Sequence, residues 1–136
     1  MERDSLTDKD IREILSLNNV AVVGISKNEE KAAHYVPKYL AQNNYNIIPI
    51  NHTADEILNK KCYHNISEIN EPIDIVDVFR PSDQVLPVIQ EAIKKKPKVI
   101  LLQEGIHNEE AEEMAREAGI RVVFNRCMLA EHQRLF

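Results

Sequence analysis

Tryptophan is absent from this sequence, and glycine and cysteine are scarce, with three and two residues among 136. Because there are also only six prolines, the composition argues against a disordered or low-complexity chain. The two cysteines, Cys62 and Cys127, suit a reducing compartment, where a structural disulfide would be unusual. No apolar run approaches the ~20 residues of a membrane span, and the stretch MERDSLTDKD is too polar for a secretory signal. These absences predict a cytoplasmic protein that does not associate with membranes.

Positive charge is also in deficit, since the formal net charge is −5 at pH 7. Nucleic-acid-binding proteins usually carry a basic surplus, so we expect no nucleic acid partner. Lysines and arginines grouped in one place can still bind an anionic small molecule; the sequence identifies neither a protein partner nor an oligomeric state. The chain fits one domain over residues 1–136, long enough to bury a core without disulfides or metals. Within it we expect a leading helix in residues 1–18 and a C-terminal cap segment over residues 125–136.

Five short runs have the length and β-branched content of strands: residues 20–23, 47–50, 73–79, 99–102 and 120–124. Their apolar character is mostly continuous rather than alternating, which is typical of parallel strands covered on both faces. Helical patterns lie between these runs. We expect a helix capped by Thr7, one starting near Ala33 with Pro37 in its first turn, one over residues 82–95, and one capped by Asn108 and ended by Gly119.

Strands and helices that alternate in this way predict a Rossmann-like, doubly wound α/β fold, a three-layer sandwich around a five-stranded parallel sheet. The favoured strand order is 3-2-1-4-5, and the flavodoxin-like order 2-1-3-4-5 is the alternative. In both, ligands bind outside the carboxyl ends of the strands, so the residues that follow each strand are the candidates for a site. They are Gly24 to Lys27, Asn51 to Thr53, Arg80 to Ser82, Gln103 to Ile106 and Asn125 to Cys127.

The loop after the first strand contains one glycine, Gly24, where the dinucleotide-binding fingerprint has three. Gly24 allows a ligand to approach the backbone closely, and Ser26 offers a hydroxyl near the next helix N-terminus. Lys27 and Lys31 add positive charge. This combination favours a phosphate site, with a tight turn and solvated lysines as the alternative.

The loop after the second strand begins with Asn51 and His52. Dinucleotide enzymes usually place an acidic residue here to bind the ribose hydroxyls. A carboxylate would repel a phosphorylated ribose, whereas Asn51 and His52 would not. This argues against ordinary NAD binding, unless Asn51 merely ends the strand.

The third loop contains an arginine and an apolar pair. Arg80 could pair with a phosphate through its planar fork, or else form a salt bridge with Asp74 or Asp77. Phe79 and Pro81 offer an apolar surface to an adenine or a pantetheine arm, although an aromatic residue in a strand is more often part of the core.

The terminal stretch NRCMLAEHQRLF combines a cysteine, a histidine and an acid. Cys127 and His132 could form a thiolate–imidazole pair oriented by Glu131, or could bind a metal together with Cys62 and His64. The spacings match no strong zinc pattern, and no oxyanion-hole motif accompanies the pair. We therefore expect no metal and no catalytic residue, with Cys127 and His132 as the only catalytic candidates, and a C-terminal helix that packs across the ligand cleft.

Taken in order, the segments VAVVGIS, IPIN, DIVDVFRP, LLQEGIHNEEA and NRCMLAEHQR resemble the CoA-binding domain family. These are small stand-alone Rossmann proteins similar to the N-terminal domain of the succinyl-CoA synthetase α subunit, and the resemblance covers residues 20–134. It implies that coenzyme A or an acyl-CoA binds at the carboxyl edge of the sheet. The implied contacts are Gly24, Ser26 and Lys27 at the pyrophosphate, Asn51 and His52 near the ribose and its 3′-phosphate, Phe79, Arg80 and Pro81 along the cleft, Gln103, Gly105 and Ile106 on the pantetheine side, and Cys127 near the thiol end or the cleft floor.

The sequence also departs from the synthetase. The glycine-rich first loop and the domain with a phosphorylated histidine have no counterpart here, so ligase activity is not implied. His52 stands where the synthetase has a basic residue after the second strand. We therefore favour a non-catalytic CoA-binding module, with an NAD(P)-binding module of the redox-sensor type and a thioester-handling enzyme that uses Cys127 and His132 as alternatives.

Overall fold

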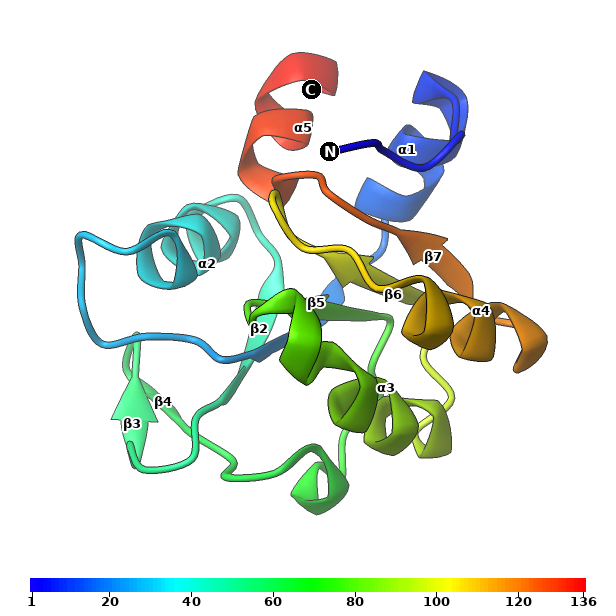
Figure 1. Ribbon diagram of the computed structural model, residues 1–136. Coiled ribbons are helices and arrows are strands. Elements are labelled where there is room, and N and C mark those ends of the chain that lie inside the picture. The colour runs from blue at the N-terminus through cyan, green and yellow to red at the C-terminus, as the bar shows by residue number, and fades with distance from the viewer.

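A parallel sheet of five strands forms the centre of the computed structural model, which describes residues 1–136 (Figure 1). Its strands are β1 (Asn19–Val23), β2 (Asn46–Ile50), β5 (Ile75–Val78), β6 (Val99–Leu102) and β7 (Arg121–Val123). Helices cover both faces, so the predicted Rossmann-like α/β fold around a five-stranded parallel sheet is confirmed.

The strands lie in the order β2-β1-β5-β6-β7, with β5 paired to both β1 and β6. The run at residues 73–79 is therefore central, in the alternative order 2-1-3-4-5, and not the outer third strand of the favoured order. All four residues of β5 are buried, as expected of a strand with a neighbour on each side. The position outside β2 is taken by Tyr63, which forms a single parallel bridge to Ile50. When Tyr63 is counted as a one-residue third strand, the order becomes 3-2-1-4-5-6, which contains the predicted pattern.

Two hydrophobic cores lie on opposite faces of the sheet. The helices are α1 (Asp8–Leu15), α2 (Ala32–Gln42), α3 (Val85–Lys94), α4 (Glu109–Glu117) and α5 (Met128–Leu135). The first, second and fifth helices pack on one face, and the third and fourth pack on the other. The predicted caps are confirmed, since the Thr7 and Asn108 side chains accept backbone N–H bonds at 3.2 and 3.0 Å. Every helix is too short or too polar to span a bilayer.

Pro37 lies deeper in α2 than expected, because the helix begins at Ala32 and the proline is beyond its first turn. Proline has no N–H to donate to the Ala33 carbonyl one turn earlier. That carbonyl instead accepts the Ser26 N–H at 3.1 Å. The proline thus frees an acceptor that fixes the loop after β1 to the helix.

The chain between β2 and β5 forms a small hairpin, β3 (Glu56–Ile57) and β4 (Lys60–Lys61), and a 3-10 helix, η1 (Ile66–Glu68). The sequence predicts only short turns in this polar stretch. A second 3-10 helix, η2 (Ser82–Gln84), precedes α3.

Candidate functional site

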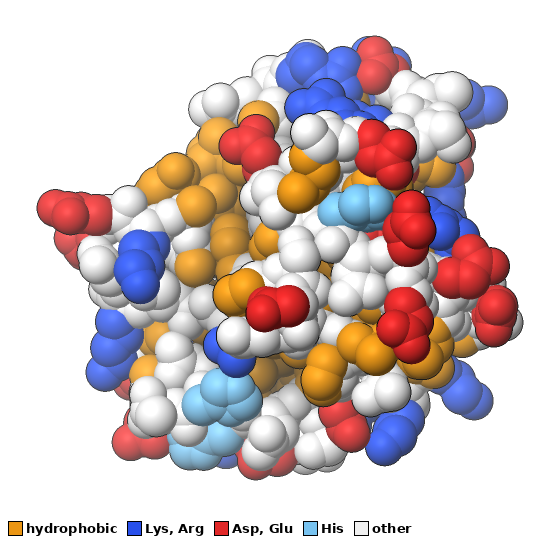
Figure 2. All heavy atoms as spheres, in the orientation of Figure 1, with side chains coloured by type: hydrophobic (Ala, Val, Ile, Leu, Met, Phe, Trp, Pro, Cys, Tyr) orange, Lys and Arg blue, Asp and Glu red, His pale blue; other side chains and the backbone are white.

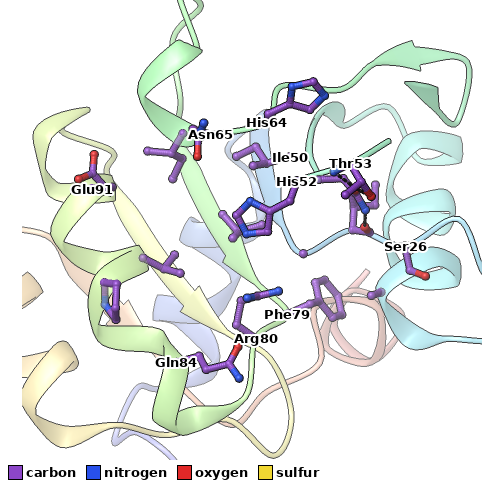
Figure 3. Close-up of a pocket in the computed structure, with 18 of the residues that line it drawn as sticks. Ser26, Ile50, His52, Thr53, His64, Asn65, Phe79, Arg80, Gln84 and Glu91 are labelled. Atoms are coloured by element: carbon purple, nitrogen blue, oxygen red, sulfur yellow. Dashed lines mark hydrogen bonds between the residues drawn. The ribbon is translucent and has the colours of Figure 1, made fainter. Parts of the chain in front are cut away.

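A cleft of about 1110 Å³ opens at the carboxyl ends of β1, β2 and β5 (Figure 3). Its walls are the loops after β1 and β2, the segment after β4, and the start of α3. Open α/β sheets bind ligands at this edge, beside the strand where the chain reverses its direction across the sheet. Figure 2 shows histidine side chains gathered between the β3–β4 hairpin and α3, whereas acidic side chains gather over α4.

The structure brings only part of the predicted site together. The predicted residues that line the cleft are Gly24, Ser26, Asn51, His52, Phe79 and Arg80. Those that do not line it are Lys27, Pro81, Gln103, Gly105, Ile106 and Cys127. Most of the second group follows β6 or β7, so the cleft occupies one half of the carboxyl edge.

Gly24 is required by the contact between β1 and β5. Its φ is 84°, and a Cβ at this position would lie 2.4 Å from the Phe79 carbonyl oxygen and 3.1 Å from Cδ of Arg80. Any other residue would therefore displace the end of β5 and the arginine that follows it.

Ser26 is held by backbone contacts, and its hydroxyl hydrogen stays available to a ligand. Its N–H donates to Ala33, its carbonyl accepts from Nδ1 of His34 at 2.7 Å, and its Oγ accepts the Asn28 N–H at 3.0 Å. Of the two lysines predicted for this loop, Lys31 at the start of α2 lines the cleft and Lys27 does not. The hydroxyl, one of the lysines and the helix N-terminus therefore occur together.

Asn51 organises the loop after β2. Its Nδ2 donates to the Ile25 carbonyl at 2.8 Å, and its Oδ1 accepts the N–H groups of Thr53 and Ala54 at 2.9 and 2.8 Å. The side chain therefore does more than end a strand, and its oxygen is already occupied by two amides.

Arg80 is the group best placed to bind an anion. It is partly buried at the end of β5, and Figure 3 shows its guanidinium pointing toward His52 from the opposite wall. A guanidinium and an imidazole that line the same cleft, with no carboxylate bonded to the guanidinium, favour a bound anion.

The salt bridges that could have occupied Arg80 do not form. Asp74 accepts the Asn19 N–H at 2.9 Å, and Asp77 accepts from Nε2 of Gln103 at 2.8 Å. Both carboxylates therefore have other partners, and the guanidinium of Arg80 remains unpaired.

Asp77 is fully buried in β5, and its Oδ1 accepts from Gln103, which follows the neighbouring strand β6. Burial raises the pKa of Asp77 to about 7, and the hydrogen bond from Gln103 opposes this shift. Its second oxygen, Oδ2, has no hydrogen-bond partner. This carboxyl therefore gains a proton close to neutral pH.

Sequence reasoning missed most of the wall opposite β1. The missed residues include His64, Asn65, Ile66, Ser67, Asp83, Gln84, Pro87, Val88 and Glu91. Asp83 and Gln84 continue the loop after β5 and could have been found by extending that loop. The segment after β4 reaches the cleft through the single bridge at Tyr63, which leaves no pattern in the sequence.

The C-terminal helix does not pack across the cleft, so that expectation is wrong. Helix α5 packs against α1 and α2, and none of its residues lines the cleft. Nδ1 of His132 lies 2.7 Å from the Tyr39 hydroxyl. Glu131 accepts hydrogen bonds from Arg126 and Arg134 and does not orient the imidazole.

Cys127 lies in surroundings that disfavour a thiolate. Burial raises the pKa of its thiol, the charges of Asp77 and Glu104 raise it further, and the amides of Ala130 and Leu129 oppose the shift. Reactive cysteines usually have positive neighbours, so these surroundings argue against a nucleophile.

The cysteines and histidines considered as metal ligands are dispersed. Cys62 is buried in the core on the α2 side, whereas His64 lies at the cleft. The three potential ligands that do converge are Glu2, His107 and Glu109, which lie within 4.8 Å of one another on the surface. Exposed acidic groups of this kind are common without an ion.

A protein family described as "CoA binding domain" matches residues 18–133. The chain belongs to the CoA-binding domain family. The resemblance drawn from its ordered motifs is therefore confirmed, and the cleft lies within the matched part of this CoA-binding chain.

Curated relatives place the family in two contexts. The chain is 40% identical over 124 residues to the uncharacterized protein YneT of Bacillus subtilis, which covers 90% of this chain and 92% of YneT. It is 31% identical over 129 residues to the ADP-forming acetate–CoA ligase of Methanocaldococcus jannaschii. That match covers 89% of this chain but 18% of the ligase, so the chain corresponds to a small part of that enzyme.

Solved structures also include both proteins of similar length and much larger proteins. A hypothetical protein from Pyrococcus horikoshii OT3 superposes with a TM-score of 0.93 at 41% identity and covers 99% of both chains. The dinucleotide forming acetyl-coenzyme A synthetase 1 of Ca. Korarchaeum cryptofilum gives a TM-score of 0.72 at 31% identity, covering 85% of this chain and 27% of that chain. The family fold thus occurs in chains of this length and within larger CoA-handling proteins.

Proposed function

We propose that the cleft binds coenzyme A or an acyl-CoA at the carboxyl edge of the sheet, and that the chain binds this ligand without catalysing a reaction on it. The observation that carries the proposal is Arg80, an unpaired guanidinium that lines the cleft beside His52. A partly buried cation without a counter-ion is stabilised by an anion from outside.

Coenzyme A suits the size and the chemistry of this cleft. Its volume of about 1110 Å³ exceeds the ~300–1,000 Å³ of typical ligand pockets, as a large ligand requires. Lys31, Ser26 and Arg80 offer donors to several phosphate oxygens. The other wall combines the apolar Ile66 and Val88 with polar side chains, which suits an adenine or an amide-rich arm.

The absence of an organised nucleophile supports binding without catalysis. Cys127 has a raised thiol pKa, and His132 is bonded to Tyr39. One relative is an ADP-forming acetate–CoA ligase, but this chain spans only 18% of its length. We therefore carry over CoA binding and not ligase activity.

An NAD(P)-binding module is the alternative on the same fold. It needs an acceptor after β2 for the two ribose hydroxyls. Asn51 is neutral, and its oxygen is taken by the amides of Thr53 and Ala54. This arrangement favours CoA over NAD.

We place this binding in the cytoplasm. Both cysteines, Cys62 and Cys127, are free thiols. Free thiols persist in the reduced cytosol, where the thiol of the ligand would persist as well.

A thermal-shift panel with CoA, acetyl-CoA, NAD, NADP and ATP tests the proposal. A ligand at about 100 times its dissociation constant adds about 2.7 kcal/mol of stability, which raises the melting temperature by several degrees. We expect this shift with CoA and acetyl-CoA, and none with NAD. Stabilisation by NAD without stabilisation by CoA would replace this proposal with the alternative.

A further inference from the structure

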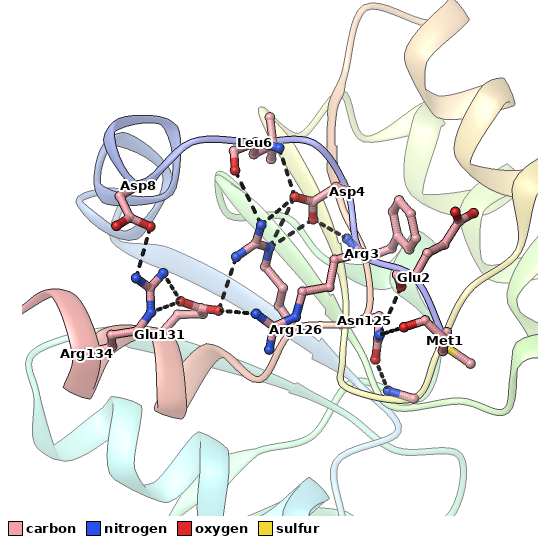
Figure 4. Close-up of polar contacts among 12 residues, drawn as sticks. Met1, Glu2, Arg3, Asp4, Leu6, Asp8, Asn125, Arg126, Glu131 and Arg134 are labelled. Atoms are coloured by element: carbon pink, nitrogen blue, oxygen red, sulfur yellow. Dashed lines mark hydrogen bonds and ion pairs between the residues drawn. The ribbon is translucent and has the colours of Figure 1, made fainter.

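Residues 1–6, which we call the strap, run across the carboxyl ends of β6 and β7 before α1 begins (Figure 4). The Phe124 N–H, just after β7, donates to Asp4 at 3.0 Å, and Glu2 lies 3.5 Å from His107 in the loop after β6. The strap thus covers the half of the carboxyl edge that the cleft does not include.

One buried ion pair fastens the strap. The Asp4 side chain is 3% exposed and accepts from Arg126 through Nη2 at 2.8 Å and Nε at 3.1 Å. Arg126 also donates through Nη1 to Glu131 at 3.2 Å. Because Glu131 remains with the arginine, Asp4 can leave without stranding an unpaired buried charge.

Asn125 connects the strap to the loop after β6. Its Oδ1 accepts the Gly105 N–H at 2.7 Å, while its Nδ2 donates to the carbonyls of Met1 and Glu2 at 3.3 and 2.9 Å. It holds a φ of 54°, a left-handed conformation that is uncommon for a residue other than glycine. While the strap is closed, Oδ1 of Asn125 therefore stays hydrogen-bonded to the Gly105 N–H. This N–H is a donor at the ligand-binding edge of the sheet.

Few apolar contacts oppose the opening of the strap. Met1 is 74% exposed, and the fully buried core begins only at Ile11 in α1. Leu6, at the junction with α1, is partly buried against the core. Segments held by polar contacts over little buried apolar surface open locally at low free energy.

We propose that the strap is an autoinhibitory cover on the β6–β7 half of the edge, latched by Asp4, and that a ligand extending from the cleft displaces it. Opening releases Asn125, and the Gly105 N–H then becomes free to donate to a carbonyl oxygen of that ligand. This rests on the proposed function only for the identity of the ligand, since the latch and the Asn125 contacts are independent of it.

The test compares Asp4→Ala with Asp8→Ala, a matched control in which an exposed carboxylate of the same ion-pair network is lost from Arg134. NMR-detected hydrogen exchange reports the Gly105 amide, with the β1 and β5 amides as internal references. The Phe124 amide is not a reporter, because Asp4 is its acceptor and the substitution removes that bond directly. We expect exchange at Gly105 to be at least tenfold faster in Asp4→Ala and unchanged in Asp8→Ala. The isosteric Asp4→Asn, which keeps a hydrogen-bond acceptor, should fall between them.

Calorimetry with CoA gives the second readout. A cover that competes with the ligand reduces its apparent affinity by the fraction of chains that are open, so we expect Asp4→Ala to bind CoA three- to tenfold more tightly than wild type. Unchanged exchange at Gly105, or exchange that rises equally in β1 and β5, would show that the strap is part of the global fold and overturn the proposal. Faster exchange with unchanged CoA affinity would also overturn it. A wild-type chain that does not bind CoA would instead refute the proposed function, and the exchange rates would still decide whether the strap opens.

Discussion

The two halves of the carboxyl edge differ in how their polar groups are used. Over β2, β1 and β5, Arg80 and the Ser26 hydroxyl hydrogen have no internal partner and face a cleft. Over β6 and β7, Gln103, Gly105 and Asn125 have side-chain or backbone partners within the chain.

This difference separates two reasons for placing polar residues after a strand. In the open half Arg80 and Ser26 are available to a ligand, although Asn51 holds its own loop and Ile25 in place. In the closed half the polar residues hold neighbouring segments together. The position of a residue after a strand therefore predicts that it lies at the edge, and only its hydrogen-bond partners show whether it is free to bind.

The largest expected effect is on the free energy of unfolding, and it differs between Gly24 in the open half and Gly105 in the closed half. In Gly24→Ala the new Cβ would lie 2.4 Å from the Phe79 carbonyl oxygen at a φ of 84°, so we expect a loss of roughly 2–5 kcal/mol in the free energy of unfolding. Gly105 has almost the same φ, 85°, but nothing within 4 Å of its would-be Cβ, so Gly105→Ala should lose only about 1–2 kcal/mol. Urea denaturation measures both. Equal losses would mean that the clash at Gly24 relaxes freely.

Asp77 lies at the boundary between the halves, and its raised pKa predicts how the stability of the protein depends on pH. Burial disfavours the charge of Asp77 and raises its pKa from the ordinary 3.8 to about 7 in the folded chain. Between about pH 4 and 7 the folded state holds a proton that the unfolded state has lost, so stability falls as pH rises through this window. Asp77→Asn should remove this fall, and its stability relative to wild type should rise by about 2–4 kcal/mol from pH 4 to pH 8.

Asp74 is the matched control for this pH profile. Burial raises its pKa, but the amides of Asn19 and Asn18 and the charge of Lys98 lower it more, so the net shift is downward. Its contribution is present above its unfolded pKa and is lost as pH falls, the opposite direction to that of Asp77. Denaturation of Asp74→Asn across the same pH range should therefore show a deficit at neutral pH that shrinks in acid. A profile of Asp77→Asn parallel to wild type would show that Asp77 is ionised in the fold.

Arg80→Ala tests the open half directly. Loss of a charged hydrogen bond to a phosphate should weaken CoA binding by about 1.5–3 kcal/mol, which is roughly 10- to 150-fold. Arg12→Ala, which removes an exposed arginine on α1, is the matched control and should leave affinity unchanged. Calorimetry measures both, and equal affinities in the two variants would assign Arg80 to structure.

The sequence was sufficient for the elements but not for their final arrangement. Thr7, Asn108 and the continuous apolar runs predicted caps and strands, because these depend on residues close together in the chain. The position outside β2 is taken by the single bridge at Tyr63, and one residue leaves no periodic signal, so the run at residues 73–79 was expected there instead of between β1 and β6. The closed half depends on Asp4 meeting Arg126, which lies 122 residues away, and no local pattern reports such a contact.

Cys127→Ser, in the closed half, should have the smallest effect on CoA affinity. It tests whether the ligand reaches that half. Cys127 does not line the cleft, so CoA affinity should stay within about twofold, or roughly 0.4 kcal/mol. A tenfold loss would place the thiol in the site and extend the open half toward β7. Measuring the same substitution in the Asp4→Ala background distinguishes two causes of such a loss. If the serine matters only when the strap is unlatched, the ligand reaches Cys127 after opening. If it matters equally in both backgrounds, the closed half contributes to binding with the strap in place, and the division of the edge drawn here is wrong.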